Sequence, residues 1–367
     1  NCDQAVATVV VSNVIDAVND TPSAVTSGDT TPSVITNDTL DGAPAVIGTN
    51  PGQVSLTGVT VPSVLTLNAD GTITVKPNTP SGTYTVTYEI CENGASPANC
   101  DQAVATVVVS NVIDAVNDTP NAVTSGDTTP SVIKNDTLDG APAVIGTNPG
   151  QVSLTGVTVP SQLTLNADGT ITVKPNTPSG TYTVTYEICE NGASPANCDQ
   201  ATATVVVSNV IDAVNDTPSA VTSGDTTPSV ITNDTLDGAP AVIGTNPGQV
   251  TLTGVTVPSV LTLNADGTIT VKPNTPSGTY TVTYEICENG ASPANCDQAV
   301  ATVVVSNVID AVNDTPSAVT SGDTTPSVIT NDTLDGAPAV IGTNPGQVSL
   351  TGVTVPSVLT LNADGTI

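Results

Sequence analysis

The sequence is one 98-residue unit that is repeated with almost no change. Asn-Cys-Asp-Gln begins at residue 1 and returns at residues 99, 197 and 295, a constant spacing of 98 residues. A unit of this length matches one small domain. A site that acts once needs no copying, whereas tandem copies supply length, avidity or mechanical continuity. The repeat therefore indicates that the function lies in the array rather than in one pocket.

The repeat also divides the chain. We expect residues 1–14 to be the last strand of an upstream repeat, residues 15–112, 113–210 and 211–308 to be complete repeats, and residues 309–367 to be a truncated repeat. The chain begins without Met and ends within a unit, so we expect it to be an excerpt from a longer array. Five aligned positions differ between copies: Ser23/Asn121, Thr36/Lys134, Val64/Gln162, Val104/Thr202 and Ser153/Thr251.

The charge of the chain excludes several classes of partner. The net charge is −30, the four basic residues are all Lys, and there is no His. Nucleic acid is excluded because no cationic surface exists to neutralise phosphates. An anionic membrane surface is disfavoured for the same reason. No apolar run is long enough to span a membrane in this segment. Without His, the usual base of a nucleophilic triad is missing, so we expect no enzyme.

Apolar residues alternate with a period of two, and no helical stripe occurs. Turn signals such as Asp41-Gly42, Asp70-Gly71 and Asn93-Gly94 separate the alternating runs. The pattern predicts an all-β chain, a tandem array of seven-stranded immunoglobulin-like β-sandwiches. The strands expected in the first complete repeat are Ala24–Thr26, Ser33–Thr36, Val54–Val61, Val64–Asn68, Thr72–Lys76, Thr83–Cys91 and Asp101–Ser110.

The phase of the last two strands predicts a disulfide in each repeat. Tyr84, Val86, Tyr88 and Ile90 form the inward set of one strand, so Cys91 falls on the outward phase. Cys100 falls on the outward phase of the following strand. Two Cys on the same face of adjacent antiparallel strands can meet, and such a short loop contributes about 2–3 kcal/mol. The expected pairs are Cys91–Cys100, Cys189–Cys198 and Cys287–Cys296, which favour an oxidising, extracellular setting.

Tyr84 is open to two interpretations. It follows Gly82-Thr83 at the start of its strand, as the tyrosine corner of sandwich domains does. Alternatively, it is an ordinary half-buried Tyr of a strand.

Four motifs occur in order in each unit and carry a resemblance to a known family. They are Asp16-Ala17-Val18-Asn19-Asp20, the Asn37–Gly42 segment, the Leu65–Ile73 segment and the Gly82–Cys91 segment. The series resembles the tandem immunoglobulin-like or cadherin-like repeats of large cell-surface adhesins in gliding and related Bacteroidota. The resemblance covers the whole unit. It implies a cell-surface adhesin or filament that is exported by type IX secretion.

The resemblance also suggests calcium at the linkers between repeats. The stretch from Asp16 to Pro22 is similar to the cadherin inter-domain linker, although one extra residue separates the Asp from the Asn. Carboxylate oxygens are suitable ligands for Ca²⁺. Asn37, Asp38, Asp41, Glu89 and Glu92 are possible further ligands; alternatively, all these groups are turn and linker carboxylates in water. The expected metal ligands are Asp16, Asn19, Asp20, Asp114, Asn117, Asp118, Asp212, Asn215, Asp216, Asp310, Asn313 and Asp314.

Short Asp-Thr sequences resemble the O-glycosylation sequon of Bacteroidota. Each unit contains Asp29-Thr30-Thr31 and Asp38-Thr39-Leu40, although such tripeptides also arise by chance in a Thr-rich chain. The candidate sites are Thr30, Thr39, Thr128, Thr137, Thr226, Thr235, Thr324 and Thr333.

Two functions remain open at this stage. The first is a structural segment of a bacterial extracellular filament, stalk or adhesin, whose partners are neighbouring repeats or copies of the chain itself. The second is an array of weak carbohydrate- or surface-binding modules that act by avidity. Sugar sites commonly use exposed aromatic rings, but Tyr84 and Tyr88 both point inward by phase. The first function is therefore favoured over the binding of surface glycans.

Overall fold

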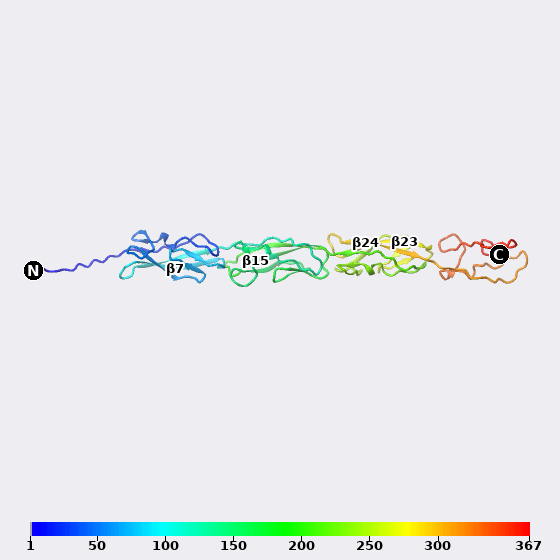
Figure 1. Cartoon of the computed structure of the whole chain (residues 1–367), viewed down its shortest axis with the longest axis horizontal. Coiled ribbons are helices and arrows are strands. Elements are labelled where there is room, and N and C mark those ends of the chain that lie inside the picture. The colour runs from blue at the N-terminus through cyan, green and yellow to red at the C-terminus, as the bar shows by residue number, and fades with distance from the viewer. Residues whose placement is uncertain (1) are drawn as a thin grey trace. The chain divides into compact units, whose positions relative to one another are not determined.

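The chain folds into β-strands joined by turns and short 3-10 helices, as a computed structural model of residues 2–367 shows (Figure 1). The predicted all-β class is confirmed. The strands of the first repeat are β1 (Ile15–Asp16), β2 (Thr39–Leu40), β3 (Ala43–Pro44), β4 (Val54–Thr60), β5 (Leu65–Leu67), β6 (Ile73–Val75), β7 (Gly82–Glu92) and β8 (Cys100–Val109).

The later copies repeat this order of strands. The second has β9 (Ile113–Asp114), β10 (Thr137–Leu138), β11 (Ala141–Pro142), β12 (Val152–Thr158), β13 (Leu163–Leu165), β14 (Ile171–Val173), β15 (Gly180–Glu190) and β16 (Cys198–Val207). The third has β17 (Ile211–Asp212), β18 (Thr235–Leu236), β19 (Ala239–Pro240), β20 (Val250–Thr256), β21 (Leu261–Leu263), β22 (Ile269–Val271), β23 (Gly278–Glu288) and β24 (Cys296–Val305). The fourth has β25 (Ile309–Asp310), β26 (Thr333–Leu334) and β27 (Ala337–Pro338). The 3-10 helices are η1 (Val34–Asn37), η2 (Val132–Asn135) and η3 (Val230–Asn233).

By its internal contacts the chain divides into two compact units. The first unit contains the residues up to Asn121, Thr128–Thr172 and Tyr182–Val205. The second contains Ala122–Asp127, Val173–Thr181 and Val206–Ile367. The passage from the first repeat to the second lies inside the first unit, and the passage from the second repeat to the third lies inside the second unit.

The first repeat shows the topology of each complete copy. Its main sheet has the order β4-β7-β8, with β7 in the centre. Strand β7 pairs antiparallel with β8 from Gly82 opposite Val109 to Cys91 opposite Cys100. The chain at Asp20 and Val25 lies parallel to the other edge of β8. Strands β5 and β6 form a hairpin, and β1, β2 and β3 form a small third sheet.

The core follows the predicted alternation. Val86, Tyr88 and Ile90 of β7 are fully buried, and Tyr84 is partly buried against the same core. Ala103, Ala105, Val107 and Val109 of β8 are buried in step with them. Outward-facing residues of β7, such as Thr83 and Thr85, are exposed. The β-branched aliphatic residues suit a strand because their side chains are stiff and pack on a pleated surface.

Two expected strands are different in the structure. Residues 33–36 do not form a strand: Val34–Asn37 is the 3-10 helix η1. A strand would place Val34 and Ile35 on opposite faces, whereas the tight turn buries both of them. Residues 24–26 contribute the single parallel bridge of Val25 to Val109, on the edge of β8 that Asp20 bridges at Ala105, and they form no continuous strand.

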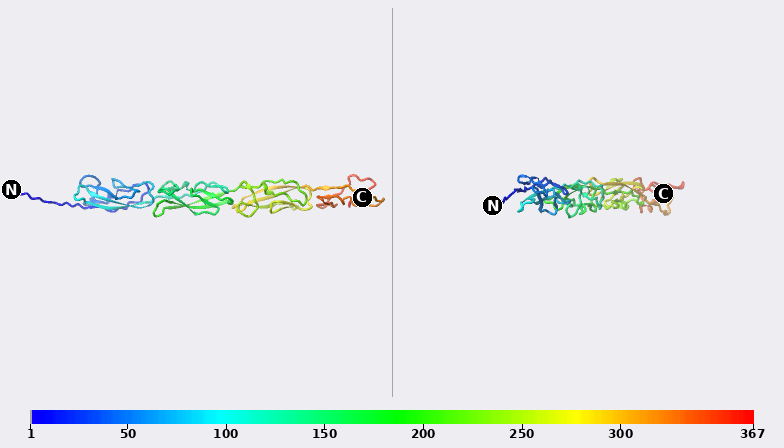
Figure 2. Two further views of the ribbon diagram at one scale, coloured as in Figure 1. Left: turned by 90° about the horizontal axis from the view of Figure 1, so that it is seen from below. Right: turned by 60° about the vertical axis from the view of Figure 1, so that its left-hand side comes forward.

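The two ends of the chain have fewer strand partners. In Figures 1 and 2, the described residues before Val14 form an extended segment that leads into the first repeat. Their assignment to an upstream repeat stays a prediction. In the fourth copy the sequence contains no counterpart of β7 or β8, and Val353 and Val358 are exposed. A β4-like strand does not form there among the described residues, since β7 is its pairing partner in the complete repeats.

Candidate functional site at the joint between repeats

A buried carboxylate connects the first repeat to the second. The Oε1 atom of Glu190 accepts hydrogen bonds from the backbone N–H of Ser81 at 3.1 Å and from Nδ2 of Asn111 at 2.6 Å. Its Oε2 atom accepts a bond from Nδ2 of Asn197 at 2.8 Å. Glu190 is only 5% exposed. A buried carboxylate is stable when donors satisfy its oxygens, and here two donors come from the preceding repeat.

Further polar contacts link the same two repeats. We call the whole set of contacts the joint. The backbone N–H of Ser194 donates to the carbonyl of Ser81 at 2.9 Å. Nδ2 of Asn197 donates to the carbonyl of Asn111 at 3.1 Å, and it also lies 3.3 Å from Oγ of Ser81. The joint is thus formed by Ser81 and Asn111 of one repeat and by Glu190, Ser194 and Asn197 of the next.

The second unit contains the same joint between the second and third repeats. Oε1 of Glu288 accepts bonds from the N–H of Ser179 at 3.1 Å and from Nδ2 of Asn209 at 2.5 Å. Nδ2 of Asn295 donates to Oε2 of Glu288 at 2.8 Å. The N–H of Ser292 donates to the carbonyl of Ser179 at 2.9 Å. The geometry is therefore a property of the repeated unit.

Copies of these residues that lack all or part of the opposite half of the joint are more exposed. Glu92, the counterpart of Glu190, is only half-buried, and it accepts a bond from Nδ2 of Asn13. Ser277, the counterpart of Ser81, is exposed, whereas Ser81 is buried. The burial of the joint residues thus comes from contact between repeats.

Glycines allow close approach at the joint. Gly150 has a φ of +78°, and a Cβ atom there would lie 2.3 Å from Oδ1 of Asn78 in the preceding repeat. Gly52, its counterpart in the first repeat, has a φ of +80° and no atom within 4 Å of the same position. A side chain at Gly150 would therefore collide with the neighbouring repeat.

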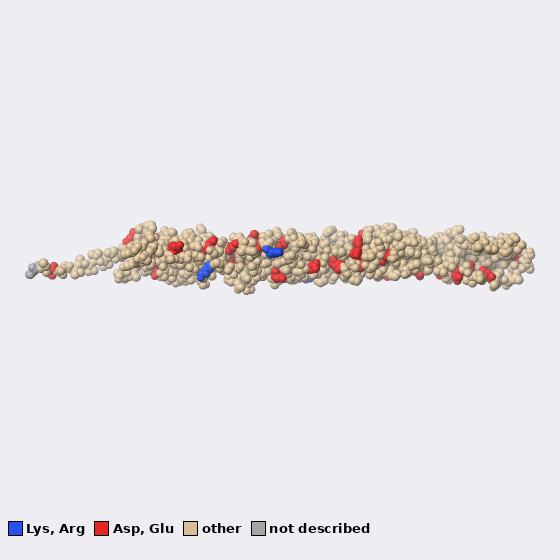
Figure 3. Space-filling model, in the orientation of Figure 1, with Lys and Arg blue, Asp and Glu red and all other residues tan. Residues whose placement is uncertain are grey.

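Acidic groups also gather near the joint. Burial raises the pKa of Asp139, and the charges of Glu190 and Asp29 raise it further. Asp237 has a raised pKa for the same causes, with Glu288 and Asp127 as its neighbours. Elsewhere the charge is dispersed: on the face shown in Figure 3, Asp and Glu side chains are scattered and Lys side chains are few.

The predicted metal ligands lie within the repeats rather than at the joint. Asp16 is in β1, opposite Thr39 of β2. Oδ1 of Asn19 accepts a bond from the N–H of Val104 at 2.8 Å, which fixes the chain at the edge of β8. Oδ2 of Asp20 lies 3.0 Å from the hydroxyl of Tyr88. The copies at Asn117, Asp118, Asn215 and Asp216 have the equivalent contacts.

The hydroxyl of Tyr88 is surrounded by oxygen acceptors. Both carboxylate oxygens of Asp38 lie 3.1 Å from it, and the carbonyls of Val18 and Val34 lie at 3.1 and 3.2 Å. Asp38 is fully buried and also accepts a bond from the N–H of Val18 at 2.7 Å. A phenol has one proton, so it cannot donate to every one of these oxygens.

This crowding of oxygens changes the acidity of the carboxyl groups. Burial and the charge of Asp38 raise the pKa of Asp20 to about 6, against an opposing hydrogen bond from Tyr88. Burial, with the charges of Asp16 and Asp101, raises the pKa of Asp38 as well. In the second repeat, Oδ2 of Asp136, the counterpart of Asp38, is buried without a hydrogen-bond partner.

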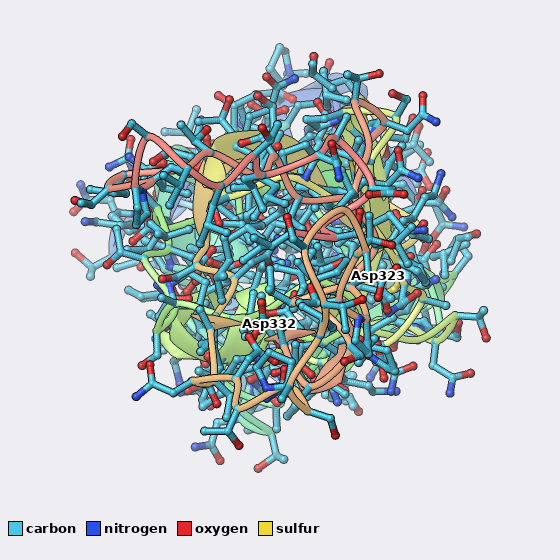
Figure 4. The ribbon with its side chains drawn as sticks, turned by 90° about the vertical axis from the view of Figure 1, so that its right-hand side faces the viewer. Asp323 and Asp332 are labelled. Carbon is cyan, nitrogen blue, oxygen red and sulfur yellow. A yellow bond between two sulfur atoms is a disulfide. The ribbon has the colours of Figure 1, made fainter. Side chains whose placement is uncertain are left out.

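In the fourth copy two acidic residues keep local partners that their counterparts have in the complete repeats. Figure 4 labels Asp323 and Asp332, which lie apart in the view. Oδ1 of Asp332 accepts a bond from the N–H of Val312 at 2.7 Å, and Asp323 accepts a bond from Oγ1 of Thr320. The counterparts of Asp332 in the complete repeats are buried, whereas Asp332 is half-buried.

The three expected disulfides are present. They join Cys91 to Cys100, Cys189 to Cys198 and Cys287 to Cys296, and Cys2 is free. Among the residues that the structure describes, the groups of three or more possible metal ligands consist of one Glu beside each disulfide. Oxidised sulfur is not a thiolate ligand, so these groups do not fit a metal ion.

The candidate glycosylation sites differ in accessibility. Thr30 and its copies Thr128, Thr226 and Thr324 are exposed, whereas Thr39 and its copies Thr137, Thr235 and Thr333 are half-buried in short strands.

The hydrogen bond of Tyr84 decides between a tyrosine corner and an ordinary half-buried strand residue. Its hydroxyl donates to the carbonyl of Pro80 at 2.8 Å, a bond back to the chain as in a tyrosine corner.

One sequence feature could have predicted the joint. Glu92 and its copies continue the inward phase of β7, two residues after Ile90. A carboxylate on that phase needs buried donors. In addition, β8 ends at Val109 and β9 begins at Ile113, so the connection is too short to separate the repeats.

Comparisons with known proteins identify no family. No family model and no curated protein match the sequence. Among solved structures, Drosophila N-cadherin EC1-3 matches at 10% identity over 79% of this chain and 99% of that chain, with a TM-score of 0.27. Mouse protocadherin-24 EC1-3 matches at 14% identity over 83% and 100%, with a TM-score of 0.24. Domains 3-6 of protocadherin gamma B2 match at 12% identity over 80% and 77%, with a TM-score of 0.23. These scores assign neither a family nor a function. Among the described residues, no helix has the length and apolar character needed to cross a membrane.

Proposed function

We propose that this chain is a structural segment of a bacterial extracellular filament, stalk or surface adhesin. The observation that carries the proposal is the joint, which recurs with the same donors at Glu190 and at Glu288. A joint of buried hydrogen bonds limits the movement of one repeat on the next, and this is what a load-bearing array requires.

Two further features support this role. A disulfide in every complete repeat suits an oxidising, extracellular location. The aromatic residues are engaged inside the repeats: Tyr88 is fully buried and the hydroxyl of Tyr84 is bonded to Pro80. Among the described residues every Tyr is buried or half-buried, which counts against repeated carbohydrate-binding modules that stack a sugar on an exposed ring.

Calcium is a secondary part of the proposal. The charges of Asp16 and Asp101 raise the pKa of Asp38, and the charge of Asp38 raises the pKa of Asp20. In the second repeat, Oδ2 of Asp136, the counterpart of Asp38, has no hydrogen-bond partner. These hard oxygen donors suit Ca²⁺. Calcium held there would stiffen the start of a repeat, and chelation would lower its melting temperature. Unfolding curves that are identical in EGTA and in calcium would remove this part.

Electron microscopy of the native material tests the structural role. Antibodies raised against the recombinant chain should label extracellular fibres or stalks of the producing cells, with labels recurring along each fibre. Saturable glycan binding by the recombinant chain, without labelled fibres, would instead support the avidity function.

A further inference from the structure

The loop that makes the joint lies between the two Cys of a disulfide. Cys189 and Cys198 flank residues 190–197, and this loop contains Glu190, Ser194 and Asn197. These three residues make the hydrogen bonds of the second repeat to Ser81 and Asn111. Outside the loop, Asp139 also accepts a bond from the N–H of Val112 at 2.8 Å and donates one to its carbonyl at 2.7 Å. In the third repeat, Cys287 and Cys296 flank the loop with Glu288, Ser292 and Asn295 in the same way.

The disulfide lies beside the loop and outside the buried core of the repeat. In the first repeat, Cys91 and Cys100 form the last residue pair between β7 and β8, directly beside the loop that joins these strands. In the second repeat, Cys189 is half-buried and Cys198 is exposed, so neither side chain belongs to the buried core. The core side chains Val184, Tyr186 and Ile188 are fully buried without them. A covalent link at this place restricts the loop far more than it adds to packing.

We propose that the disulfide orders the docking loop, and that its main effect is on the coupling between repeats rather than on the folding of the repeat that contains it. A free loop would lose conformational entropy when it docks, and this loss would oppose the contact with Ser81 and Asn111. A loop that is already closed by the disulfide loses less. The proposal rests on the structural function proposed above, because it explains how each joint is kept ordered.

The test uses the full chain with Cys2→Ser, which removes the free thiol. One variant has Cys189→Ser with Cys198→Ser, and the matched control has Cys91→Ser with Cys100→Ser. The control removes the equivalent disulfide from a loop that contacts the leading segment in place of a preceding complete repeat, through bonds between Asn13 and Glu92 or Asn99. Small-angle X-ray scattering measures the distribution of interatomic distances, and far-ultraviolet circular dichroism measures the strand content.

We expect the Cys189/Cys198 variant to keep its strand content and to show a broader distance distribution than the parent chain. The control should keep the parent distribution. An unchanged distribution in the Cys189/Cys198 variant, or an equal broadening in the control, would overturn the proposal.

A second variant covers the case in which the serine pair fails to fold. Cys189→Val with Cys198→Val places strand-forming residues at the same register. If both the serine and the valine variants lose strand content, the disulfide is required by the sandwich itself and the proposal is wrong. These measurements use the purified chain, whereas the structural function is tested by microscopy of native material. A negative result here would therefore not contradict the structural function.

Discussion

Nδ2 of Asn111 donates a hydrogen bond to Oε1 of Glu190 across 2.6 Å, although 79 positions separate the two residues in the chain. Asn111 is 7% exposed and Glu190 is 5% exposed, so this bond is shielded from water. Neither residue is fully satisfied within its own repeat. The contact between neighbouring repeats therefore supplies the hydrogen bonds that compensate for burying Asn111 and Glu190.

Glu190→Ala should uncouple the first two repeats. It leaves the N–H of Ser81 and Nδ2 of Asn111 without their acceptor, and hydrogen bonds to charged groups contribute about 1.5–3 kcal/mol each. Calorimetry of the full chain should show a lower melting temperature and a less cooperative transition. Glu92→Ala is the control, because Glu92 contacts Asn13 instead of a preceding repeat. Equal losses in the two variants would contradict a role for Glu190 in coupling.

Gly150→Ala should destabilise the joint more than Gly52→Ala destabilises the first repeat. Both glycines have a φ near +80°, so the backbone strain of adding Cβ is similar. Only Gly150 faces a neighbour, with Asn78 at 2.3 Å from the new atom. The difference between the two melting temperatures isolates the clash. A difference of zero would show that the repeats do not approach as described.

Tyr88→Phe should cost more stability than Tyr84→Phe. The hydroxyl of Tyr88 lies 3.1 Å from the carboxylate of the buried Asp38, and without it this desolvated group would lose a partner at a cost of about 1–3 kcal/mol. The hydroxyl of Tyr84 makes one bond to Pro80, which contributes about 0.5–1.5 kcal/mol. Denaturant titration of the two variants gives both values. The reverse order would argue against the Tyr88 cluster as a stabilising group.

The free energy of unfolding should fall as the pH rises from 3.8 to about 6. The pKa of Asp20, Asp118 and Asp216 is raised from 3.8 to about 6, mainly by burial. Within this window the folded repeats hold protons that the unfolded chain has released, so stability is greatest at the acidic side and levels off above it. Denaturant midpoints measured across the window check this.

A set of Asn substitutions identifies the groups responsible. Replacing Asp20, Asp118 and Asp216 by Asn should flatten the decline in midpoint. The same change at the exposed Asp70, Asp168 and Asp266, whose pKa is lowered by bonds from nearby Thr residues, should leave the decline intact.

If the native protein carries O-glycans, Thr30 and its copies should be occupied more fully than Thr39 and its copies. Thr30 is exposed, whereas Thr39 is half-buried in β2. A transferase reaches an exposed hydroxyl without opening the fold. Mass spectrometry of peptides from native material measures the occupancy at each site. An intact mass equal to that of the polypeptide would remove glycosylation altogether.

The sequence predicted the parts of the fold that depend on local alternation. Tyr84 to Ile90 and the facing residues of β8 alternate strictly, so their burial and the Cys91–Cys100 register followed from period two alone. Val34 and Ile35 are adjacent and both buried, a pattern that alternation cannot express, and η1 was missed. The joint was missed for a different reason. The bond of Asn111 to Glu190 depends on which ends of two copies meet, and the pattern inside one copy does not encode this.

Each complete repeat carries both halves of the joint, the Ser81 and Asn111 type at one end and the Glu92 and Asn99 type at the other. Any copy can therefore follow any other. Unequal recombination that adds or removes a whole unit in the gene would leave every remaining joint with matching partners. A substitution at one half, by contrast, would affect a contact whose other half lies in the next copy. The near-identity of the copies is thus compatible with an array whose length can change between generations while its construction stays the same.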